Sequence, residues 1–400
     1  MKILHTADWH IGKLLHKYGL EEDHARFLNW LSDLIEEQEI DLLLVSGDVF
    51  DTASPSSAAL SLYYTFLRRI IGKKCRVVIT GGNHDSPGVL NAPGEILKQL
   101  DIRVVGCATD DCAEGLLLFE DTGVAIAAVP FLRDVDLRRS VSGQSYADRA
   151  ETIRQGIRRH YEQFTELHQR EHRDFTLLGM GHLYVSGASV SESEREIHAI
   201  GGLAAFGCEH FPEGFQYMAL GHIHKPQKLS ETVRYSGSPI PLSFSERNDP
   251  KFVLILTLEA GKISSVETLP TPVLRELRTF SGCLDEVWEL LENYQPATEL
   301  AALVELNVVE PHFDPQKSQH FDLMLREFEK KDFKIIKPRL TFENRQKEAS
   351  ELFTVGTEIE DLTPQDVFER RLESETLDDD TRALLLEAFT ELLEEVQQTH

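Results

Sequence analysis

Five predicted strands of this chain end in the same way: an apolar run stops and a side chain of a metal-binding type follows. The third strand is the most distinctive, because residues 76–80 lead directly into Gly81-Gly82-Asn83-His84-Asp85. The other four strand ends carry Asp8 with His10, Asp48, His182, and His222 with His224. Open α/β sheets place their sites at the carboxyl ends of strands, so we expect these side chains to meet. We interpret them as the ligands of one site for two metal ions.

Each of these residues also has an ordinary structural explanation. A lone pair such as Gly181-His182 is more often structural than a ligand, and Asp48 after Gly47 fits a turn or a helix cap. The ordinary explanation has to hold separately at five strand ends that share one ligand chemistry, and we therefore favour the metal site. Five further histidines fall outside the pattern and are expected to be structural or on the surface: His5, His16, His24, His160 and His198.

The 400 residues suffice for two or three domains with a substantial apolar core. The five cysteines are scattered and form no C-x-x-C pair, which favours a reducing compartment and argues against both a disulfide framework and a zinc–thiolate site. No window approaches eighteen continuous apolar residues, so no membrane span is expected. The first predicted strand begins at Lys2, which argues against a cleaved leader.

The formal net charge of −26 does not resemble the basic footprint of a protein that grips phosphates by itself. Residues 343–400 contribute much of it, with 17 acidic and 5 basic side chains. If this chain acts on nucleic acid, bound metal ions and a partner must supply much of the attraction. Composition alone therefore leaves the substrate open.

The apolar pattern of the first 270 residues predicts an α/β fold in which two packed sheets carry helices on the outside. Predicted strands and helices alternate from residue 2 to residue 80. Ser54 is expected to cap the second helix, with Pro55 at its first position. The strands around 233–236 and 252–257 are expected to close the second sheet. The other expected elements are helices at 22–38, 55–71 and 146–171, and strands at 2–7, 40–46, 76–80, 102–105, 116–119, 124–129 and 216–220, with one more before His182.

Pro270 and Pro272 mark the predicted end of this first domain, residues 1–270. Residues 271–342 are predicted to form a small α/β domain, with helices at 284–293 and 317–329 and strands at 301–308 and 333–337. An acidic linker is expected at 343–362, followed by a helical pair at 363–400 with an apolar stripe on its second helix. Two interpretations of this pair stay equally open, docking on a partner helix or folding back onto the small domain.

Oxygen and imidazole ligands without thiolate suit manganese, iron or zinc better than magnesium. Asp48 is the expected bridge between the two ions, because it stands alone at its strand end. Such a pair of ions activates a water as hydroxide and clamps an in-line displacement, which predicts hydrolysis of a phosphate ester. His84, beside the ligand Asn83, would protonate the leaving oxygen or steady its charge, and Asp85 would fix the His84 tautomer.

The ordered motifs of the chain resemble those of the calcineurin-like metallophosphoesterases, whose fold is a four-layer β-sandwich flanked by helices. They are Asp8-Trp9-His10, Gly47-Asp48-Val49-Phe50-Asp51, Gly82-Asn83-His84-Asp85, Gly181-His182 and Gly221-His222-Ile223-His224. The opening Thr6-Ala7-Asp8-Trp9-His10-Ile11-Gly12 and the run of residues 235–244 resemble, more narrowly, the SbcD family of bacterial nuclease subunits. That resemblance extends over the full length of the chain.

The resemblance implies one metal held by Asp8, His10, Asp48 and His224, and another held by Asp48, Asn83, His182 and His222. It names His84 as the catalytic histidine and Mn²⁺ as the cofactor. It further implies a cytoplasmic bacterial nuclease that acts as a 3′–5′ double-strand exonuclease and a single-strand and hairpin endonuclease in DNA replication, recombination and repair. The expected partners are DNA ends and hairpins, a second copy of this chain, and an SbcC-type ATPase in a heterotetramer.

One position departs from the family pattern. Archaeal and eukaryotic relatives carry a second functional histidine where this chain has Asp51, and a carboxylate cannot supply the same proton to a phosphate. We expect Asp51 to orient a metal ligand from behind. Two other functions stay open: a phosphatase or phosphodiesterase for a small ester at the same site, and a binding scaffold on a degenerate enzyme fold.

Overall fold

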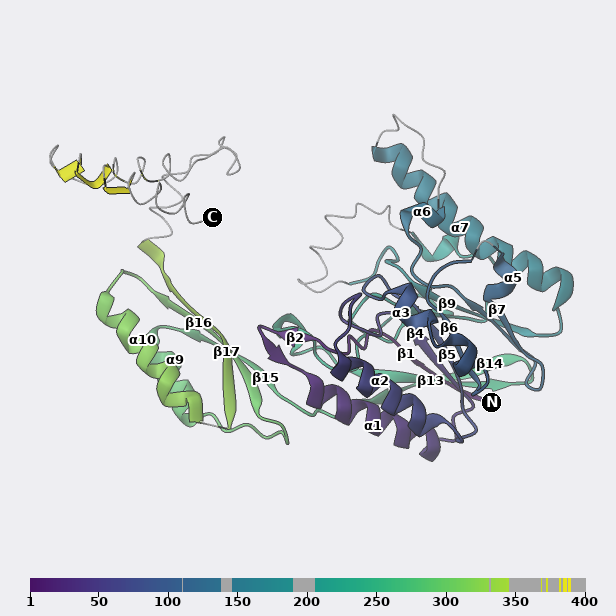
Figure 1. Cartoon of the computed structure of the whole chain (residues 1–400), viewed down its shortest axis with the longest axis horizontal. Helices are drawn as coiled ribbons and strands as arrows, with labels where there is room; N and C mark the ends of the chain where they lie inside the picture. Colours follow the sequence, from purple (N-terminus) through teal and green to yellow (C-terminus); the bar gives the residue numbers. More distant parts are fainter. Residues whose placement is uncertain are drawn as a thin grey trace. The chain divides into compact units, whose positions relative to one another are not determined.

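The chain folds into two compact units (Figure 1). The first unit comprises residues 1–278 and 296–303, and the second comprises residues 279–295 and the described residues from 304 onward. The computed structural model describes residues 1–109, 111–137, 146–189, 206–330 and 332–344, with a few positions between 368 and 389. Within this part of the chain, no helix is long and apolar enough to cross a membrane.

The first sheet of the large unit has six strands in the order β14-β13-β1-β4-β5-β6. Strands β1, β4, β5 and β6 run parallel, and the apolar residues of β1, β4 and β5 are almost entirely buried. Parallel strands covered on both faces have this near-continuous apolar character. Their carboxyl ends therefore lie at one edge of the sheet. The bounds are β1 Lys2–Thr6, β4 Leu42–Ser46, β5 Arg76–Thr80, β6 Ile102–Val105, β13 Phe252–Glu259 and β14 Lys262–Pro270.

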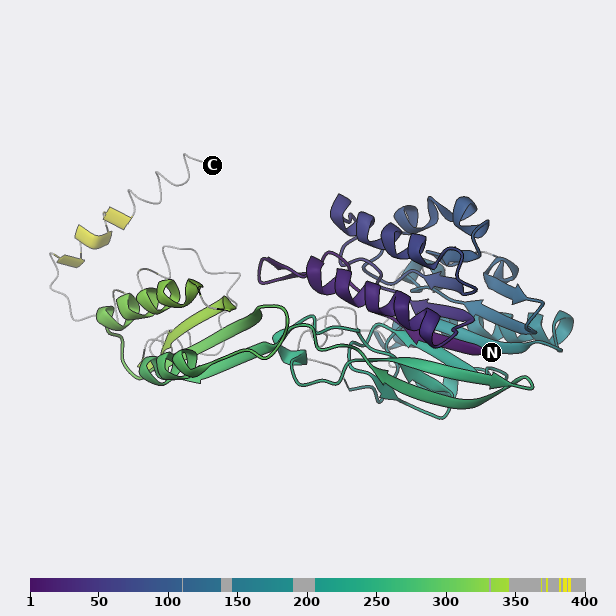
Figure 2. The same cartoon turned by 90° about the horizontal axis from the view of Figure 1, so that it is seen from below.

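Two helices, α1 (Glu21–Glu37) and α2 (Ser57–Ile70), pack against each other and cover the first sheet. In Figure 2 these purple helices lie together on one side of the strands. The predicted cap of α2 is wrong: Ser56, not Ser54, accepts a hydrogen bond from the Ala59 N–H at 3.1 Å. A serine two residues later fits the cap geometry as well, and the sequence pattern does not distinguish the two.

The second sheet has the order β11-β12-β10-β9-β8-β7. Its central strands β8, β9 and β10 are parallel and fully buried. The long helix α7 (Tyr146–Glu171) packs on it through Tyr161 and Phe164, and the Tyr161 hydroxyl donates to the Met180 carbonyl at 3.1 Å. The bounds are β7 Leu116–Phe119, β8 Val124–Ala128, β9 Thr176–His182, β10 Tyr217–Gly221, β11 Gln227–Lys228 and β12 Val233–Tyr235.

The two sheets pack face to face around a common apolar cluster that takes Leu44 from one sheet and Met180 from the other. Buried polar contacts join them as well. His5 of β1 lies 3.0 Å from the Tyr217 hydroxyl of β10, and the Ser46 hydroxyl donates to the Ala219 carbonyl at 2.9 Å. The expected α/β architecture of two packed sheets with outer helices is confirmed.

The predicted place of the strand at 252–257 is wrong, because β13 pairs antiparallel with β1 in the first sheet. Its run of apolar residues satisfies a buried strand in either sheet, so the pattern cannot choose the partner. Strand β14 then forms a hairpin with β13 that the sequence pattern did not reveal.

Short elements complete the first unit. The hairpin of β2 and β3 follows the first ligands and precedes α1. Their bounds are β2 Leu14–Leu15, β3 Tyr18–Gly19, α3 Pro87–Asn91, α4 Gly94–Lys98, α5 Cys112–Gly115, α6 Asp134–Leu137, and the 3₁₀ turns Cys208–His210 and Phe244–Glu246.

The small unit is built on a three-stranded sheet in the order β15-β16-β17 with two helices. Trp288 of α9 packs edge-on against Phe328, which stacks on Phe333. The bounds are β15 Leu277–Gly282, α9 Leu284–Asn293, β16 Ala302–Glu310, α10 Pro315–Glu327, β17 Phe333–Phe342 and the 3₁₀ turn Phe328–Lys330. The predicted linker at 343–362 and helical pair at 363–400 lie outside the described residues, apart from a few positions.

Candidate metal centre

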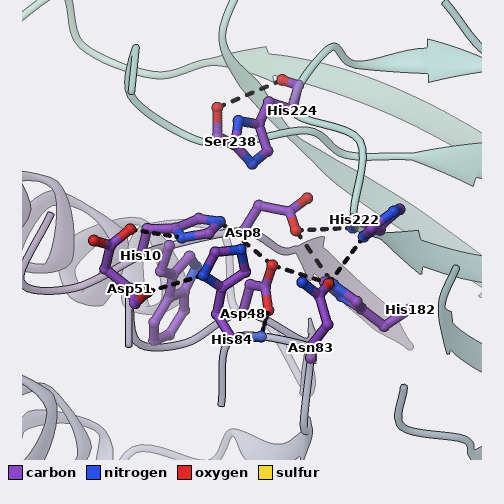
Figure 3. A network of polar contacts seen from close by, with 12 residues as sticks. Asp8, His10, Asp48, Asp51, Asn83, His84, His182, His222, His224 and Ser238 are labelled. Atoms are coloured by element: carbon purple, nitrogen blue, oxygen red, sulfur yellow. Dashed lines mark hydrogen bonds and ion pairs between the residues drawn. The ribbon is translucent and has the colours of Figure 1, made fainter. Parts of the chain in front are cut away.

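The predicted ligands meet at the edge where strands of both sheets end (Figure 3). The first sheet contributes the residues that follow β1, β4 and β5, and the second contributes the end of β9 and the turn after β10. The residues brought together are Asp8, His10, Asp48, Asn83, His84, His182, His222 and His224. The site therefore forms only where the two sheets face each other.

Four of these residues have a positive φ angle, a backbone conformation that residues other than glycine rarely adopt. The φ angles are 53° at Asp8, 47° at His10, 49° at Asp48 and 97° at His222. Such strain persists only where the surrounding structure imposes it, and it gathers at functional sites. The backbone therefore turns sharply just after these strands, where the candidate ligands lie.

Asp8, His10 and His224 form the first ligand group, with one donor atom from each lying within 4.8 Å of the others. Asp8 Oδ1 accepts the His222 N–H at 2.8 Å, whereas Asp8 Oδ2 and His10 Nε2 are buried without a hydrogen-bond partner. Buried polar atoms normally find partners, so these two atoms fit the role of metal ligands. These three residues are the predicted ligands of the first metal ion, apart from the bridging residue Asp48.

Asn83, His182 and His222 form the second group. Asn83 Oδ1 lies 3.0 Å from both His182 Nε2 and His222 Nδ1. An amide oxygen and two ring nitrogens converge here, and these are atom types that a shared cation accepts as ligands.

Asp48 lies between the two groups. Its Oδ2 is 3.4 Å from His10 Nε2 and 3.2 Å from His182 Nε2, one nitrogen from each set. Its Oδ1 accepts the His84 N–H at 2.9 Å, which fixes the carboxylate plane. This geometry suits a bridging ligand.

Hydrogen bonds behind three of the histidines determine which ring nitrogen faces the site. In each ring the Nδ1–H points away from the site and donates to a neighbouring oxygen. His182 donates to the Ser46 carbonyl (2.9 Å), His10 to Asp51 Oδ1 (3.2 Å) and His224 to Glu246 Oε1 (3.0 Å). With Nδ1 engaged in this way, Nε2 is the ring nitrogen that each histidine offers to a metal ion, and it carries a lone pair whenever the ring is neutral.

Burial perturbs the ionisation of the ligands. It raises the pKa of Asp8 to about 7 and lowers the pKa of His10 to about 4, so His10 is neutral near pH 7. Burial also opposes a charge on His182, but the Asp48 carboxylate outweighs it and raises the His182 pKa to about 9. The raised pKa values of Asp8 and His182 mean that both groups bind protons more readily than usual, and a divalent cation would displace these protons.

Close packing explains the glycines beside the ligands. A Cβ on Gly82 would lie 2.1 Å from Asp48 Oδ1, and a Cβ on Gly221 would lie 1.9 Å from the Ser46 carbonyl oxygen. The φ angle of Gly82 is not positive, so this position does not need glycine for a left-handed turn. It needs glycine because there is no space for a Cβ atom.

Asp85 differs from its predicted role. Its carboxylate, 6% exposed, accepts backbone N–H groups from Val49 (3.1 Å), Phe50 (2.9 Å) and Gly82 (2.8 Å). The His84 tautomer is fixed by the Asp51 carbonyl oxygen, which accepts from His84 Nδ1 at 2.9 Å. Asp85 thus ties together the two loops that carry Asp48 and Asn83.

Asp51 lies behind His10, where the sequence interpretation expects it. Its Oδ1 also accepts from Lys13 Nζ at 3.0 Å. Burial opposes the charge of Asp51, but His10 and Lys13 outweigh it and lower the pKa to about 2.

Sequence reasoning missed Glu246 and Lys251. Glu246 is 22 residues beyond His224, and its fully buried carboxylate accepts from Lys251 Nζ at 2.6 Å. Neither residue belongs to a recognisable motif. The segment from Ser236 to Lys251 is rich in serine and proline and also contains Arg247 and Asp249, so no local pattern singles out Glu246 or Lys251.

Two packed sheets with an Asp, Asn and His cluster at their shared edge define a metal-dependent phosphoesterase. Residues 1–226 match the calcineurin-like phosphoesterase family, and residues 273–376 match the type 5 capsule protein repressor C-terminal domain. The SbcD component of the SbcCD nuclease from Escherichia coli (strain K12) is 32% identical over 409 residues, 100% of both chains. The SbcD proteins from Rhodobacter capsulatus and Bacillus subtilis are 34% and 31% identical, over 68% and 66% of this chain and 70% and 67% of their own. The chain belongs to the SbcD nucleases within the calcineurin-like phosphoesterase family.

Proposed function

We propose that this chain is the metal-dependent nuclease subunit of an SbcCD complex and cleaves DNA phosphodiester bonds at the cluster around Asp48. The observation that carries the proposal is the position of Asp48 Oδ2, 3.4 Å from His10 Nε2 and 3.2 Å from His182 Nε2. A carboxylate so placed suits two ions that act on one phosphate.

In this proposal, Asp8, His10, Asp48 and His224 hold one ion, and Asp48, Asn83, His182 and His222 hold the other. Two bound divalent ions supply Lewis acidity and lower the pKa of a water. The oxygen and nitrogen donors suit Mn²⁺.

His84 is the proposed proton donor. Its Nδ1–H is committed to the Asp51 carbonyl oxygen, and its backbone N–H holds the Asp48 carboxylate. The ring lies 4.8 Å from that of His10, measured between centroids. His84 is thereby held beside the site, where it would protonate the leaving oxygen of the broken bond.

The proposed substrates are DNA ends and hairpins, attacked by 3′–5′ exonuclease and endonuclease cleavage in the bacterial cytoplasm. We further propose an SbcC-type ATPase partner in a heterotetramer that contains two copies of this chain. Residues 1–270 would form the nuclease domain and 271–342 a DNA-binding cap. Residues 343–362 would then link the cap to a docking segment at 363–400. Because the chain carries a net charge of −26, the metal ions and the partner would supply most of the attraction for DNA.

The test is cleavage of a labelled hairpin DNA with Mn²⁺, with and without the ATPase partner. We expect His84→Ala to bind two equivalents of Mn²⁺ and to cleave about 10²–10⁴-fold more slowly. His172 precedes β9 at the end opposite to His182 and provides a control, since His172→Ala should cleave like the wild type. If the wild type and His84→Ala degrade DNA equally slowly while both hydrolyse a small phosphodiester, the protein is a small-ester enzyme. A chain that binds two metal ions and cleaves nothing would be a scaffold.

A further inference from the structure

Glu246, in the 3₁₀ turn Phe244–Glu246, accepts hydrogen bonds with both of its carboxylate oxygens. Its carboxylate is buried, with the side chain 1% exposed. Oε2 accepts from Lys251 Nζ (2.6 Å), the Ser238 hydroxyl (3.1 Å) and the Leu242 N–H (3.2 Å). These three bonds hold together the loop that follows β12.

The other oxygen faces the metal centre. Oε1 accepts from His224 Nδ1 at 3.0 Å and from the Ser243 hydroxyl at 3.2 Å. Oε2 thus binds only the loop, whereas Oε1 binds both Ser243 of the loop and a histidine of the candidate ligand cluster.

The same loop also holds the main chain of His224. The His224 carbonyl oxygen accepts from the Ser238 N–H at 3.1 Å and from Lys251 Nζ at 3.2 Å. The loop therefore holds both the ring and the backbone of His224, and Figure 3 shows the additional contact of the Ser238 hydroxyl with the His224 carbonyl oxygen.

We propose that Glu246 positions His224 for metal binding by holding its ring in the Nδ1–H tautomer. The lone pair of Nε2 is then directed to the group formed with Asp8 and His10, whose donor atoms lie within 4.8 Å of one another. Lys251 Nζ, 2.6 Å from Oε2, pairs with the buried Glu246 carboxylate on the side away from His224 Nδ1. This inference rests on the proposed function, because it requires that the cluster binds metal ions. Partners of this kind change metal affinity by about 10–100-fold when they are removed.

Glu246→Gln tests the proposal with almost no change in volume. Lys251 Nζ and the Leu242 N–H can only donate, so the amide oxygen must take the place of Oε2. The amide NH₂ then faces His224 Nδ1, which becomes an acceptor, and the ring proton moves to Nε2. The substitution therefore places a hydrogen on the atom that is offered to the metal.

Glu310→Gln is the matched control. Glu310 is also a buried carboxylate, 1% exposed, and accepts from Lys317 and from the Leu284 N–H (2.8 Å) in the small unit. Any general cost of neutralising a buried glutamate paired with lysine should appear in both variants.

We expect calorimetric titration of the full-length chain with Mn²⁺ to find two sites in the wild type and in Glu310→Gln. In Glu246→Gln, one site should weaken by about 10–100-fold while the other is unchanged. Unchanged affinity at both sites, or an equal loss at both, would overturn the proposal.

A second measurement needs no change at Glu246. In the metal-free wild type, ¹⁵N spectra of labelled histidines, assigned by comparison with His224→Asn, should show His224 with its proton on Nδ1. A proton on Nε2 would refute the positioning role even if Glu246→Gln does not fold. The proposed nuclease function fails differently, through a wild type that binds two Mn²⁺ ions and leaves DNA intact.

Discussion

Replacing Asp85 by asparagine separates a structural role from a catalytic one. The carboxylate accepts three backbone N–H groups, from Val49, Phe50 and Gly82. An asparagine oxygen can replace Oδ2 and keep the bonds to Val49 and Gly82. Its NH₂ group then faces the Phe50 N–H, so two donors meet and one buried N–H loses its partner.

The magnitude follows from these three bonds. A buried N–H without a partner costs about 1–3 kcal/mol, and the two remaining bonds, now to a neutral oxygen, weaken by about 1 kcal/mol each. Loss of the buried charge offsets part of this cost, because burial, together with the charge of Asp48, raises the Asp85 pKa to about 6. We expect a net loss of about 2 kcal/mol, which lowers the Tm by about 4–8 °C in a unit of this size.

Thermal unfolding of the metal-free chain, followed by circular dichroism, measures this loss. Asp121→Asn is the control, because the Asp121 side chain is 60% exposed and its loss should change stability by less than about 0.5 kcal/mol. The structural reasoning is refuted if Asp85→Asn keeps the wild-type Tm and both metal ions but loses DNA cleavage. Asp85 would then take part in the reaction.

Three further outcomes are expected. Asp48→Ala should lose both metal ions and all cleavage, and two retained equivalents of Mn²⁺ would exclude Asp48 as the bridge. Mn²⁺ affinity should fall as the pH is lowered from 9 to 6, with protons released on binding. Burial raises the pKa of Asp8 to about 7, and the charge of Asp48, against burial, raises the pKa of His182 to about 9. Both groups hold protons below these values, so calorimetry in buffers of different ionisation enthalpy that shows no proton release would contradict the assignment. Deletion of residues 363–400 should spare Mn²⁺-dependent cleavage and abolish co-purification with the ATPase partner, and a truncated chain that still co-purifies would exclude that segment as the docking site.

The ligand cluster was predictable because its members share one chemistry at strand ends. An apolar run followed by Asp8 or Asp48 indicates both a strand and the end at which it stops. The partners behind the ligands carry no such signal. Ser46 acts through its main-chain carbonyl, which every residue has, and Glu246 reaches His224 only through the tertiary fold.

The fold, too, has parts that local sequence patterns predict and parts that depend on tertiary packing. Local patterns placed α7 at its observed bounds, because its apolar positions recur at helical spacing over many turns. They did not place β13, since the choice between two sheets depends on which strand edge is open. They also did not assign Asp85 its role, because an acid beside a histidine suggests a proton relay while its bonds run to backbone groups elsewhere.

The pairing of β1 with β13 has a consequence for synthesis on the ribosome. Strand β1 is among the first segments to emerge, but one of its two edges stays unpaired until residues 252–259 have been made. His182, His222 and His224 also follow long after Asp8 and His10. A nascent chain therefore cannot bring together the side chains of the two proposed ion sites before most of the first unit has left the exit tunnel. Cutting activity is delayed until the nuclease unit is nearly complete.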